Sequence, residues 1–306
     1  MTGFEKNRLW LTINPMRNPR GIRENLVPSL LVFLSLFLFF SCSETLNPGR
    51  NSDKAPASDH PPARAETEGR KKQILKPQDA LTVLNSFPHD PAAFTQGLVY
   101  RDGFLYESTG LYRKSSLRKT NPATGKVLAR TDLPREFFGE GLAIIGDSVY
   151  QLTWKSGQGF IYGKEDLKRR GTFTYSTEGW GLTDDGTQLI MSDGTEKLYF
   201  LSPESFEVTK VLRVKENGAA VARLNELEYA EGRIYCNIWH SDDIVVVDPE
   251  SGIVKRRINL GQLRERLSLS NEAGVLNGIA WKPSSRTFLI TGKNWSEVFE
   301  IKLTSP

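Results

Sequence analysis

Short apolar segments alternate with polar, turn-forming residues along most of the chain, and these segments come in pairs. Glu140 and Trp154 flank one pair and are fourteen residues apart, and Asn225 and Trp239 flank another pair at the same separation. Two short apolar segments joined by a glycine-containing turn predict an antiparallel hairpin. The start of the first strand and the end of the second lie at the same end of a hairpin, so each flanking pair is expected to meet.

Three more hairpins of this kind are predicted. They span residues 96–108, 180–193 and 277–293, and a second strand pair with its own turn follows each of the first four hairpins. The starts of the five units recur every 40 to 52 residues. Four strands per unit at this period are typical of a β-propeller, so the sequence predicts an all-β fold with five blades.

The last unit has one strand too few, because the apolar segment at residues 298–303 ends close to the terminus. The segment at residues 81–85 is expected to complete that blade and so close the ring, which removes two exposed strand edges. A sandwich fits the number of strands but not their even period. We expect residues 73–306 to form the propeller, and because a closed ring leaves few free edges, we expect a monomer.

The N-terminal region has the features of a targeting segment. Basic residues are followed by an apolar run over residues 26–40, which is short for a membrane span and typical of a signal peptide. The run ends at Ser41-Cys42, which resembles the bacterial lipoprotein signal, in which the cysteine is lipidated. The alternatives are an ordinary signal peptide and an uncleaved anchor, and translation can begin at Met1 or Met16.

The sequence therefore predicts a signal peptide at residues 1–41, lipidation of Cys42 and a location in the bacterial cell envelope, attached to the membrane by the lipid. Residues 42–72 are rich in Ser, Pro, Ala and charge, and they predict a flexible tether. The formal net charge is +4, but the signal segment accounts for three of these charges, so the high pI does not indicate nucleic-acid binding. With Cys42 lipidated, Cys236 has no disulfide partner, and we expect it to be a buried thiol.

Metal, serine-nucleophile and phosphate-loop chemistry have little support in the sequence. The three histidines are scattered, no cluster has zinc-ligand spacing, and neither Gly-x-Ser-x-Gly nor a phosphate loop occurs. Equivalent ends of the predicted hairpins instead carry one acid, one base, two amides and three indoles. This set comprises Gln96, Glu140, Trp154, Trp180, Asn225, Trp239 and Lys293. Each of them taken alone could pack or face water, but their equivalent places favour one shared site.

The same region carries motifs in every unit that resemble one enzyme family. They include Phe94-Thr95-Gln96-Gly97-Leu98, Phe138-Gly139-Glu140-Gly141-Leu142, Thr177-Glu178-Gly179-Trp180-Gly181, Leu224-Asn225-Glu226-Leu227, Leu276-Asn277-Gly278-Ile279 and Thr291-Gly292-Lys293. In order and spacing they resemble the plant and bacterial type of glutaminyl cyclase, over about residues 81–303. The resemblance implies a five-bladed propeller that converts an N-terminal glutamine of a peptide into pyroglutamate with loss of ammonia.

The resemblance also implies roles for single residues. It implies Glu140 as the acid/base and Lys293 as the conserved lysine, with Gln96 and Asn225 as polar pocket residues. It implies that the aromatic walls of the pocket are Phe94, Phe138, Trp154, Trp180 and Trp239. No cofactor is expected for the chemistry, and the expected partners are peptides or proteins with N-terminal Gln.

The sequence leaves two other functions open. The first is a non-catalytic lipoprotein propeller that binds a peptide or an envelope component through the same aromatic rim. The second is a lactonase-like hydrolase, in which Asn225, Glu226 and Asn277 would hold a catalytic calcium in the channel, although the channel aspartates of such enzymes are missing. A structural calcium in the channel is a separate question that the sequence also leaves open.

Overall fold

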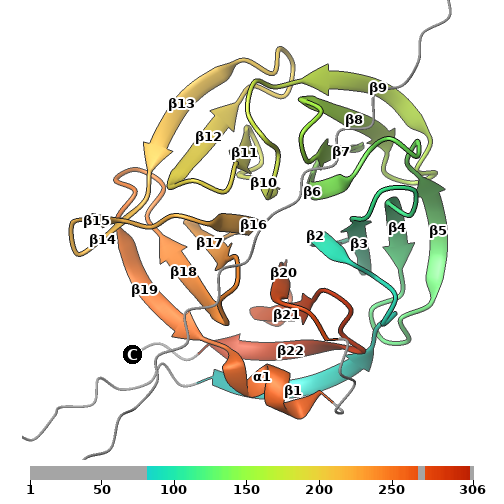
Figure 1. Ribbon diagram of the computed structural model, residues 1–306. Coiled ribbons are helices and arrows are strands. Elements are labelled where there is room, and N and C mark those ends of the chain that lie inside the picture. The colour runs from blue at the N-terminus through green and yellow to red at the C-terminus, as the bar shows by residue number, and fades with distance from the viewer. Residues whose placement is uncertain (1–80, 268–272, 304–306) are drawn as a thin grey trace, which may run out of the picture. The chain divides into compact units, whose positions relative to one another are not determined.

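The described residues, 81–267 and 273–303 of a computed structural model, form five four-stranded antiparallel sheets arranged around a common centre (Figure 1). The predicted five-bladed β-propeller is confirmed. The expected signal peptide at 1–41, the lipidation site Cys42 and the expected tether at 42–72 lie outside the described residues. Within the described residues, no helix has the length and hydrophobicity that crossing a bilayer requires.

Each blade is a meander that begins at the centre of the ring. Blade I comprises β2 (Thr95–Arg101), β3 (Phe104–Thr109), β4 (Ser116–Thr120) and β5 (Val127–Asp132). Blade II comprises β6 (Gly139–Ile145), β7 (Ser148–Thr153), β8 (Gln158–Gly163) and β9 (Arg169–Thr174). Blade III comprises β10 (Leu182–Asp184), β11 (Leu189–Ser192), β12 (Lys197–Leu201) and β13 (Val208–Arg213).

The other two blades follow the same plan. Blade IV comprises β16 (Leu224–Ala230), β17 (Arg233–Ile238), β18 (Asp243–Val247) and β19 (Val254–Asn259). Blade V comprises β20 (Leu276–Lys282), β21 (Thr287–Gly292), β22 (Glu297–Leu303) and β1 (Leu81–Pro88). The sequence did not predict the small hairpin β14 (Lys215–Glu216) with β15 (Ala219–Ala220), nor the helix α1 (Gly261–Arg266).

The first strand completes the last blade, as the sequence predicts. β1 pairs antiparallel with β22 from Leu81 opposite Leu303 to Pro88 opposite Glu297, and the two strands lie side by side in Figure 1. The first and last described strands therefore lie in one sheet, and β22 is not left as an unpaired edge at the closure.

The turns of the inner hairpins have the chemistry that the sequence indicates. Asp102 and Gly103 connect β2 to β3, and both have positive φ, at 54° and 85°. Glu231 and Gly232 connect β16 to β17 with φ of 51° and 73°. Two-residue turns with positive φ at both positions match the twist of the flanking strands, so the strands can pair up to the turn.

The apolar core consists of five clusters, one between each pair of adjacent blades. Neighbouring residues of one strand serve different clusters. Ile144 packs toward blade I, whereas Ala143 packs toward blade III. This is the period-two alternation of a strand that is buried on both faces. Cys236 is fully buried in the cluster between blades III and IV, as expected, and burial raises the pKa of its thiol.

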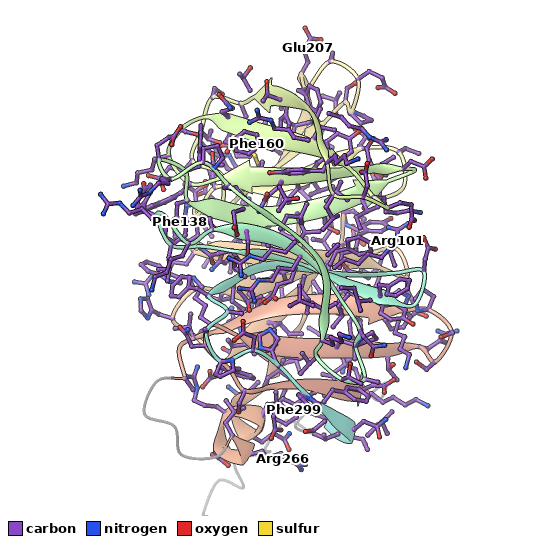
Figure 2. All side chains as sticks on the ribbon, turned by 90° about the vertical axis from the view of Figure 1, so that its right-hand side faces the viewer. Arg101, Phe138, Phe160, Glu207, Arg266 and Phe299 are labelled. Atoms are coloured by element: carbon purple, nitrogen blue, oxygen red, sulfur yellow. The ribbon has the colours of Figure 1, made fainter. Side chains whose placement is uncertain are left out.

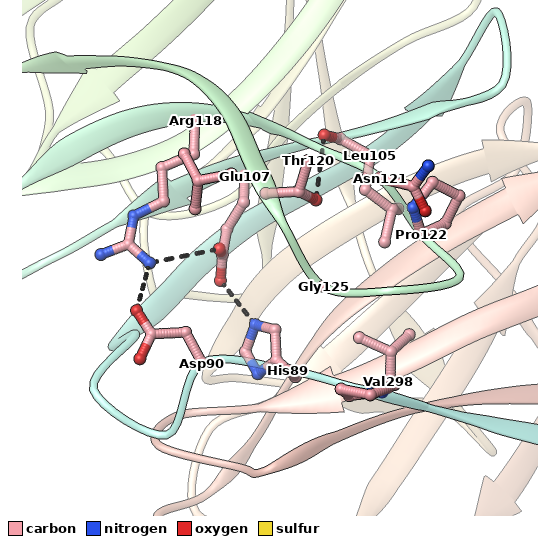
Figure 3. Close-up of a pocket in the computed structure, with 12 residues that line it drawn as sticks. His89, Asp90, Leu105, Glu107, Arg118, Thr120, Asn121, Pro122, Gly125 and Val298 are labelled. Atoms are coloured by element: carbon pink, nitrogen blue, oxygen red, sulfur yellow. Dashed lines mark hydrogen bonds and ion pairs between the residues drawn. The ribbon is translucent and has the colours of Figure 1, made fainter.

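The cluster between blades I and V has the fewest buried apolar members, and a polar network lies beside it (Figure 3). His89 Nε2 lies 3.0 Å from Glu107 Oε1, while His89 Nδ1 lies 2.7 Å from the carbonyl oxygen of Trp295. Arg118 Nη1 lies 2.8 Å from Asp90 Oδ2 and 3.9 Å from Glu107 Oε2. Because both ring nitrogens of His89 face acceptors, the charged imidazolium fits this place and links the two blades where the ring closes.

Candidate active site

The polar residues that the sequence places at hairpin starts lie on β-bulges of the innermost strands. The pairing register shifts around Gln96 in β2, Glu140 in β6, Asn225 in β16 and Asn277 in β20. A bulge leaves a residue unpaired and turns its side chain out of the regular alternation, which is why bulges recur beside active sites. Four of the five blades therefore have a polar residue on a bulge at the equivalent position of the innermost strand.

The position after each of these residues sets how closely the inner strands approach one another. It is glycine after Gln96, Glu140 and Asn277, and Gly181 follows Trp180 in blade III. A Cβ atom on Gly141 would overlap the backbone nitrogen of Leu182 in the next blade. Blade IV has Glu226 at this position. The fully buried Glu226 carboxylate accepts hydrogen bonds from the backbone N–H groups of Leu98, at 3.1 Å, and Ile279, at 2.8 Å. Glu226 thus links blade IV to blades I and V at the centre.

The residue that follows the second strand of an inner hairpin lies at the same end of that hairpin as the start of its first strand, as predicted. The backbone N–H of Trp154 bonds to the carbonyl oxygen of Phe138 at 3.0 Å. Trp239 makes the equivalent bond to Arg223, and Lys293 to Val275, both at 2.9 Å. Figure 2 shows Phe138 at one end of the propeller and Arg101, beside the first hairpin turn, at the other. The hairpin ends that carry the candidate residues therefore share one end of the ring.

Glu140 and Lys293 are both buried here, with 4 % and 6 % of their surfaces exposed. Burial raises the pKa of Glu140 well above its usual value, while the positive charge of Lys293 and the side chain of Gln96 act in the opposite direction. Burial lowers the pKa of Lys293, and the negative charge of Glu140 acts against that shift. The Gln96 side chain donates a hydrogen bond to Glu140, whereas Lys293 forms neither a hydrogen bond nor a close ion pair among the described residues. An acid and a base that influence each other electrostatically are thus buried together at this end of the ring.

The two side-chain amides of the predicted set are in different states. Gln96 Oε1 accepts a hydrogen bond from Asn277 Nδ2 at 3.2 Å, which leaves the Gln96 amino group for the side facing Glu140. Asn225 is 2 % exposed, and its side-chain amide has no hydrogen bond among the described residues. Buried polar groups are normally hydrogen-bonded, and a group without a partner calls for an explanation such as a ligand. Asn225 can therefore donate or accept within the site.

The aromatic residues are half-buried around these polar groups. Phe94 and Phe138 meet edge to face at 6.1 Å between ring centroids, and Phe138 lies 5.6 Å from Trp154. On the other side, Trp180 and Trp239 meet at 5.4 Å with perpendicular rings. All nine residues predicted for the site thus lie at one end of the ring, with polar groups buried among the innermost strands and the rings of Phe94, Phe138, Trp154, Trp180 and Trp239 more exposed. This arrangement suits a small ligand with an apolar stem and polar ends.

Comparison with known proteins identifies the family of this chain. The pattern of the glutamine cyclotransferase family matches residues 61–303. The chain belongs to the glutamine cyclotransferase family. It is 42% identical over 227 residues to a glutaminyl-peptide cyclotransferase of Arabidopsis thaliana, which covers 73% of this chain and 71% of that protein. It is also similar to the crystal structure of Myxococcus xanthus glutaminyl cyclase, with a TM-score of 0.68 and 38% identity, covering 72% of this chain and 95% of that one.

Three residues of this glutamine cyclotransferase site were not predicted as site residues. Asn277 orients Gln96, as described above. Tyr112, half exposed in the loop after β3, has its ring 5.4 Å from that of Phe138. Glu178, in the loop before β10, accepts hydrogen bonds from the indole N–H groups of both Trp154 and Trp180. Glu178 could have been noticed, because it lies two residues before Trp180 in a quoted motif.

Two of the three residues that the calcium-dependent alternative would use, Glu226 and Asn277, are engaged in hydrogen bonds within the propeller. Both carboxylate oxygens of Glu226 accept backbone N–H groups, and Asn277 Nδ2 donates to the carbonyl oxygen of Thr95 at 3.0 Å as well as to Gln96. Across residues 81–267 and 273–303, no three His, Cys, Asp or Glu side chains form a group that could hold a metal ion.

Proposed function

We propose that this chain is a glutaminyl-peptide cyclotransferase, which converts the N-terminal glutamine of a peptide into pyroglutamate and releases ammonia. The observation that carries the proposal is the buried pair of Glu140 and Lys293 among aromatic rings, in which the Gln96 side chain hydrogen-bonds to Glu140 and Lys293 has no hydrogen bond among the described residues. Membership of the glutamine cyclotransferase family supports the same activity. The substrate class is therefore peptides or proteins with a free N-terminal Gln.

The reaction needs one base, one acid and a site for a developing negative charge. The substrate α-amine must lose a proton and attack the carbon of its own γ-carboxamide. A tetrahedral intermediate then forms with a negative oxygen, and it collapses when its nitrogen leaves as ammonia. No water is consumed, so a pocket that excludes water loses nothing and gains stronger electrostatic interactions.

Glu140 can serve both proton steps. As a carboxylate it takes the proton from the α-ammonium, and as an acid it returns that proton to the departing nitrogen. The burial that raises the pKa of Glu140 brings it toward the range in which one group can accept and return a proton near neutral pH. Positioned general acid–base catalysis of this kind is typically worth about 10²- to 10⁴-fold in rate.

Lys293 and Asn225 suit the developing oxyanion. The Lys293 ammonium is 4.8 Å from the centre of the Phe94 ring, which orients it in the pocket without using its N–H donors in a hydrogen bond. Asn225, in blade IV, offers a buried side-chain amide that has no hydrogen bond among the described residues. Donors that are already in place when the charge develops give the largest single contribution in many acyl-transfer reactions.

The aromatic rings position the substrate and take no part in the proton transfers. Because the amine and the carboxamide belong to one residue, the pocket needs only to fold the glutamine side chain so that the two groups meet. Half-buried indoles can cover its methylene groups and hold the α-ammonium over a ring face before deprotonation. We propose that no cofactor takes part in this chemistry.

The proposed location of the enzyme rests on the sequence alone. We propose that residues 1–41 are removed as a signal peptide, that Cys42 carries the lipid, and that residues 42–72 tether the propeller to the cell envelope. Metabolic labelling of the expressed chain with a fatty-acid analogue tests this directly. The label should be present in the wild type and absent from Cys42→Ala, whereas equal labelling of both would contradict the proposal.

Ammonia release from a free-amine Gln peptide by the purified full-length protein tests the activity. One ammonia should appear for each peptide consumed, with and without EDTA, and none from the same peptide with an acetylated N-terminus. Binding of several Gln peptides with no release would instead favour the non-catalytic propeller that binds a peptide or envelope component. Release that disappears with EDTA would contradict the metal-independent mechanism.

A further inference from the structure

The loop over residues 175–181 between β9 and β10 brings a carboxylate to the aromatic rim. The backbone N–H of Gly179 bonds to the carbonyl oxygen of Trp154 at 2.8 Å, and a Cβ atom on Gly179 would crowd the Tyr175 hydroxyl. The loop is thus fastened to the backbone of one pocket wall, beside Glu178.

The Glu178 side chain accepts two hydrogen bonds through one oxygen atom. Its Oε2 accepts the indole N–H of Trp154 at 2.9 Å and the indole N–H of Trp180 at 3.0 Å. Its other oxygen is 3.6 Å from the ammonium of Lys155, and 41 % of the side chain is exposed. Hydrogen bonds to a charged acceptor are stronger than neutral ones, so the carboxylate fixes how both indoles are turned.

These bonds join two separate groups of rings. Trp154 packs against Phe138 in one group, and Trp180 packs against Trp239 in the other. Among the described residues, no ring contact links the two groups, and Glu178 connects them. We propose that Glu178 is a positioning residue that orients the Trp154 and Trp180 indoles and so sets the width of the pocket for the substrate glutamine. This inference rests on the proposed function.

Glu178 also acts on the acid/base group through space. After burial, which is the main cause, the negative charge of Glu178 adds to the raised pKa of Glu140, against the effects of Lys293 and Gln96. The carboxylate therefore has two separable effects, of which one depends on its acceptor oxygen and the other on its charge. Two substitutions distinguish them. Glu178→Gln keeps an acceptor and removes the charge, and Glu178→Leu removes both.

The first test observes the indoles without substrate. The chain has six tryptophans, and their indole N–H signals can be recorded by NMR in the full-length protein and assigned with Trp154→Phe and Trp180→Phe. In Glu178→Leu, the Trp154 and Trp180 signals should move, while that of Trp295, whose indole donates to the carbonyl oxygen of Gly274, should stay and report that the fold is intact. Unmoved Trp154 and Trp180 signals would overturn the proposal.

The second test measures kinetics with a free-amine Gln peptide. Glu178→Leu should raise KM by about 10- to 100-fold, the cost of losing charge-assisted hydrogen bonds, and change kcat less. Glu178→Gln should restore KM toward the wild type but move the acidic limb of kcat/KM to lower pH, because the pKa of Glu140 falls. Glu136→Gln, at an exposed carboxylate in the loop before β6, is the matched control and should change neither.

The outcomes separate the two proposals. An unchanged KM in Glu178→Leu, with an active wild type, would overturn the role of Glu178 while the proposed function stands. If the wild type releases no ammonia from Gln peptides, the proposed function fails, and the indole signals still decide whether Glu178 orients the rings.

Discussion

The Lys293 ammonium lies 4.8 Å from the centre of the Phe94 ring, so that a cation from blade V faces an aromatic side chain at the start of blade I. Glu140, from blade II, is the acidic group that acts on the pKa of Lys293. Three blades thus meet in one buried acid–base unit. The electrostatic state of this unit determines how the site responds to mutation and to pH.

Replacing Lys293 by methionine should slow catalysis more than it weakens binding. Methionine keeps most of the volume beside Phe94 but removes the positive donor that we assign to the oxyanion. We expect kcat to fall by about 10²- to 10³-fold, as for the loss of one such donor elsewhere. Initial rates of ammonia release over a range of peptide concentrations give kcat and KM separately. A rise in KM with an unchanged kcat would show that Lys293 only binds the substrate.

The pH dependence of catalysis should reflect the environment of Glu140. Because burial raises the pKa of Glu140 and the reaction begins from the carboxylate, kcat/KM should decline as the pH falls through that raised pKa, above the value of an ordinary glutamate. The residual activity of Lys293→Met should decline at higher pH still, because the positive charge that lowers the pKa of Glu140 is gone. Profiles measured with the same peptide test this, and a limb that moves to lower pH would contradict it.

The His89–Glu107 pair should make stability depend on pH. Burial acts to lower the pKa of His89, but Glu107 and the Trp295 carbonyl outweigh it and raise the pKa, whereas that of Glu107 is lowered despite its burial, chiefly by His89. The contribution of His89 is therefore full below about pH 6.5 and is lost as the pH rises through its raised pKa. That of Glu107 is present above its ordinary pKa and is lost as the pH falls through its lowered one.

His89→Gln should thus destabilise the propeller most between these limits. We expect a loss of about 3–5 kcal/mol at pH 6, as for removal of one partner from a buried ion pair, and a smaller loss at pH 9.5. Urea unfolding at both pH values measures the difference. An equal loss at both would mean that His89 acts by packing and not by charge.

Glu226→Gln should destabilise the fold without removing a contact of the aromatic side chains in the site. A glutamine can accept only one of the two backbone N–H bonds that reach Glu226 from Leu98 and Ile279, and its amino group then faces the other N–H. A buried donor without an acceptor costs about 1–3 kcal/mol. Urea unfolding at neutral pH should show this loss, and Glu250→Gln, at an exposed carboxylate, should not.

Turn residues and the spacing of apolar segments in the sequence were enough to predict the propeller fold. Asp102-Gly103 is a favoured pair for a tight hairpin turn with positive φ, and Glu231-Gly232 has glycine at the second turn position, so the hairpins could be placed from them. The strand at residues 81–85 was predicted to complete the last blade because an open ring would leave two unpaired edges, and it is part of β1. The regular repeat of the hairpins along the chain predicted the number of blades.

The sequence could not show the contacts that only the closed ring creates. The bulges around Glu140 and Asn225 depend on how adjacent inner strands crowd one another, which has no periodic signal. Glu178 and Asn277 act on side chains far away in sequence or in another blade, and an isolated Glu or Asn in a loop or strand does not reveal its partner. The helix α1 has no side-chain cap at its start, and so it lacked the usual signal of a helix.

The assignment of Glu140 as the acid/base is tested most sharply by comparing turnover with binding in Glu140→Gln. Glutamine keeps the size and polarity of the side chain but can neither take the proton from the α-ammonium nor return it to the leaving nitrogen. Ammonia release from a free-amine Gln peptide and calorimetric binding of the same peptide should be measured on one preparation. We expect release to fall by about 10²- to 10⁴-fold while binding stays measurable. Turnover close to that of the wild type, or an equal loss of turnover and binding, would contradict it.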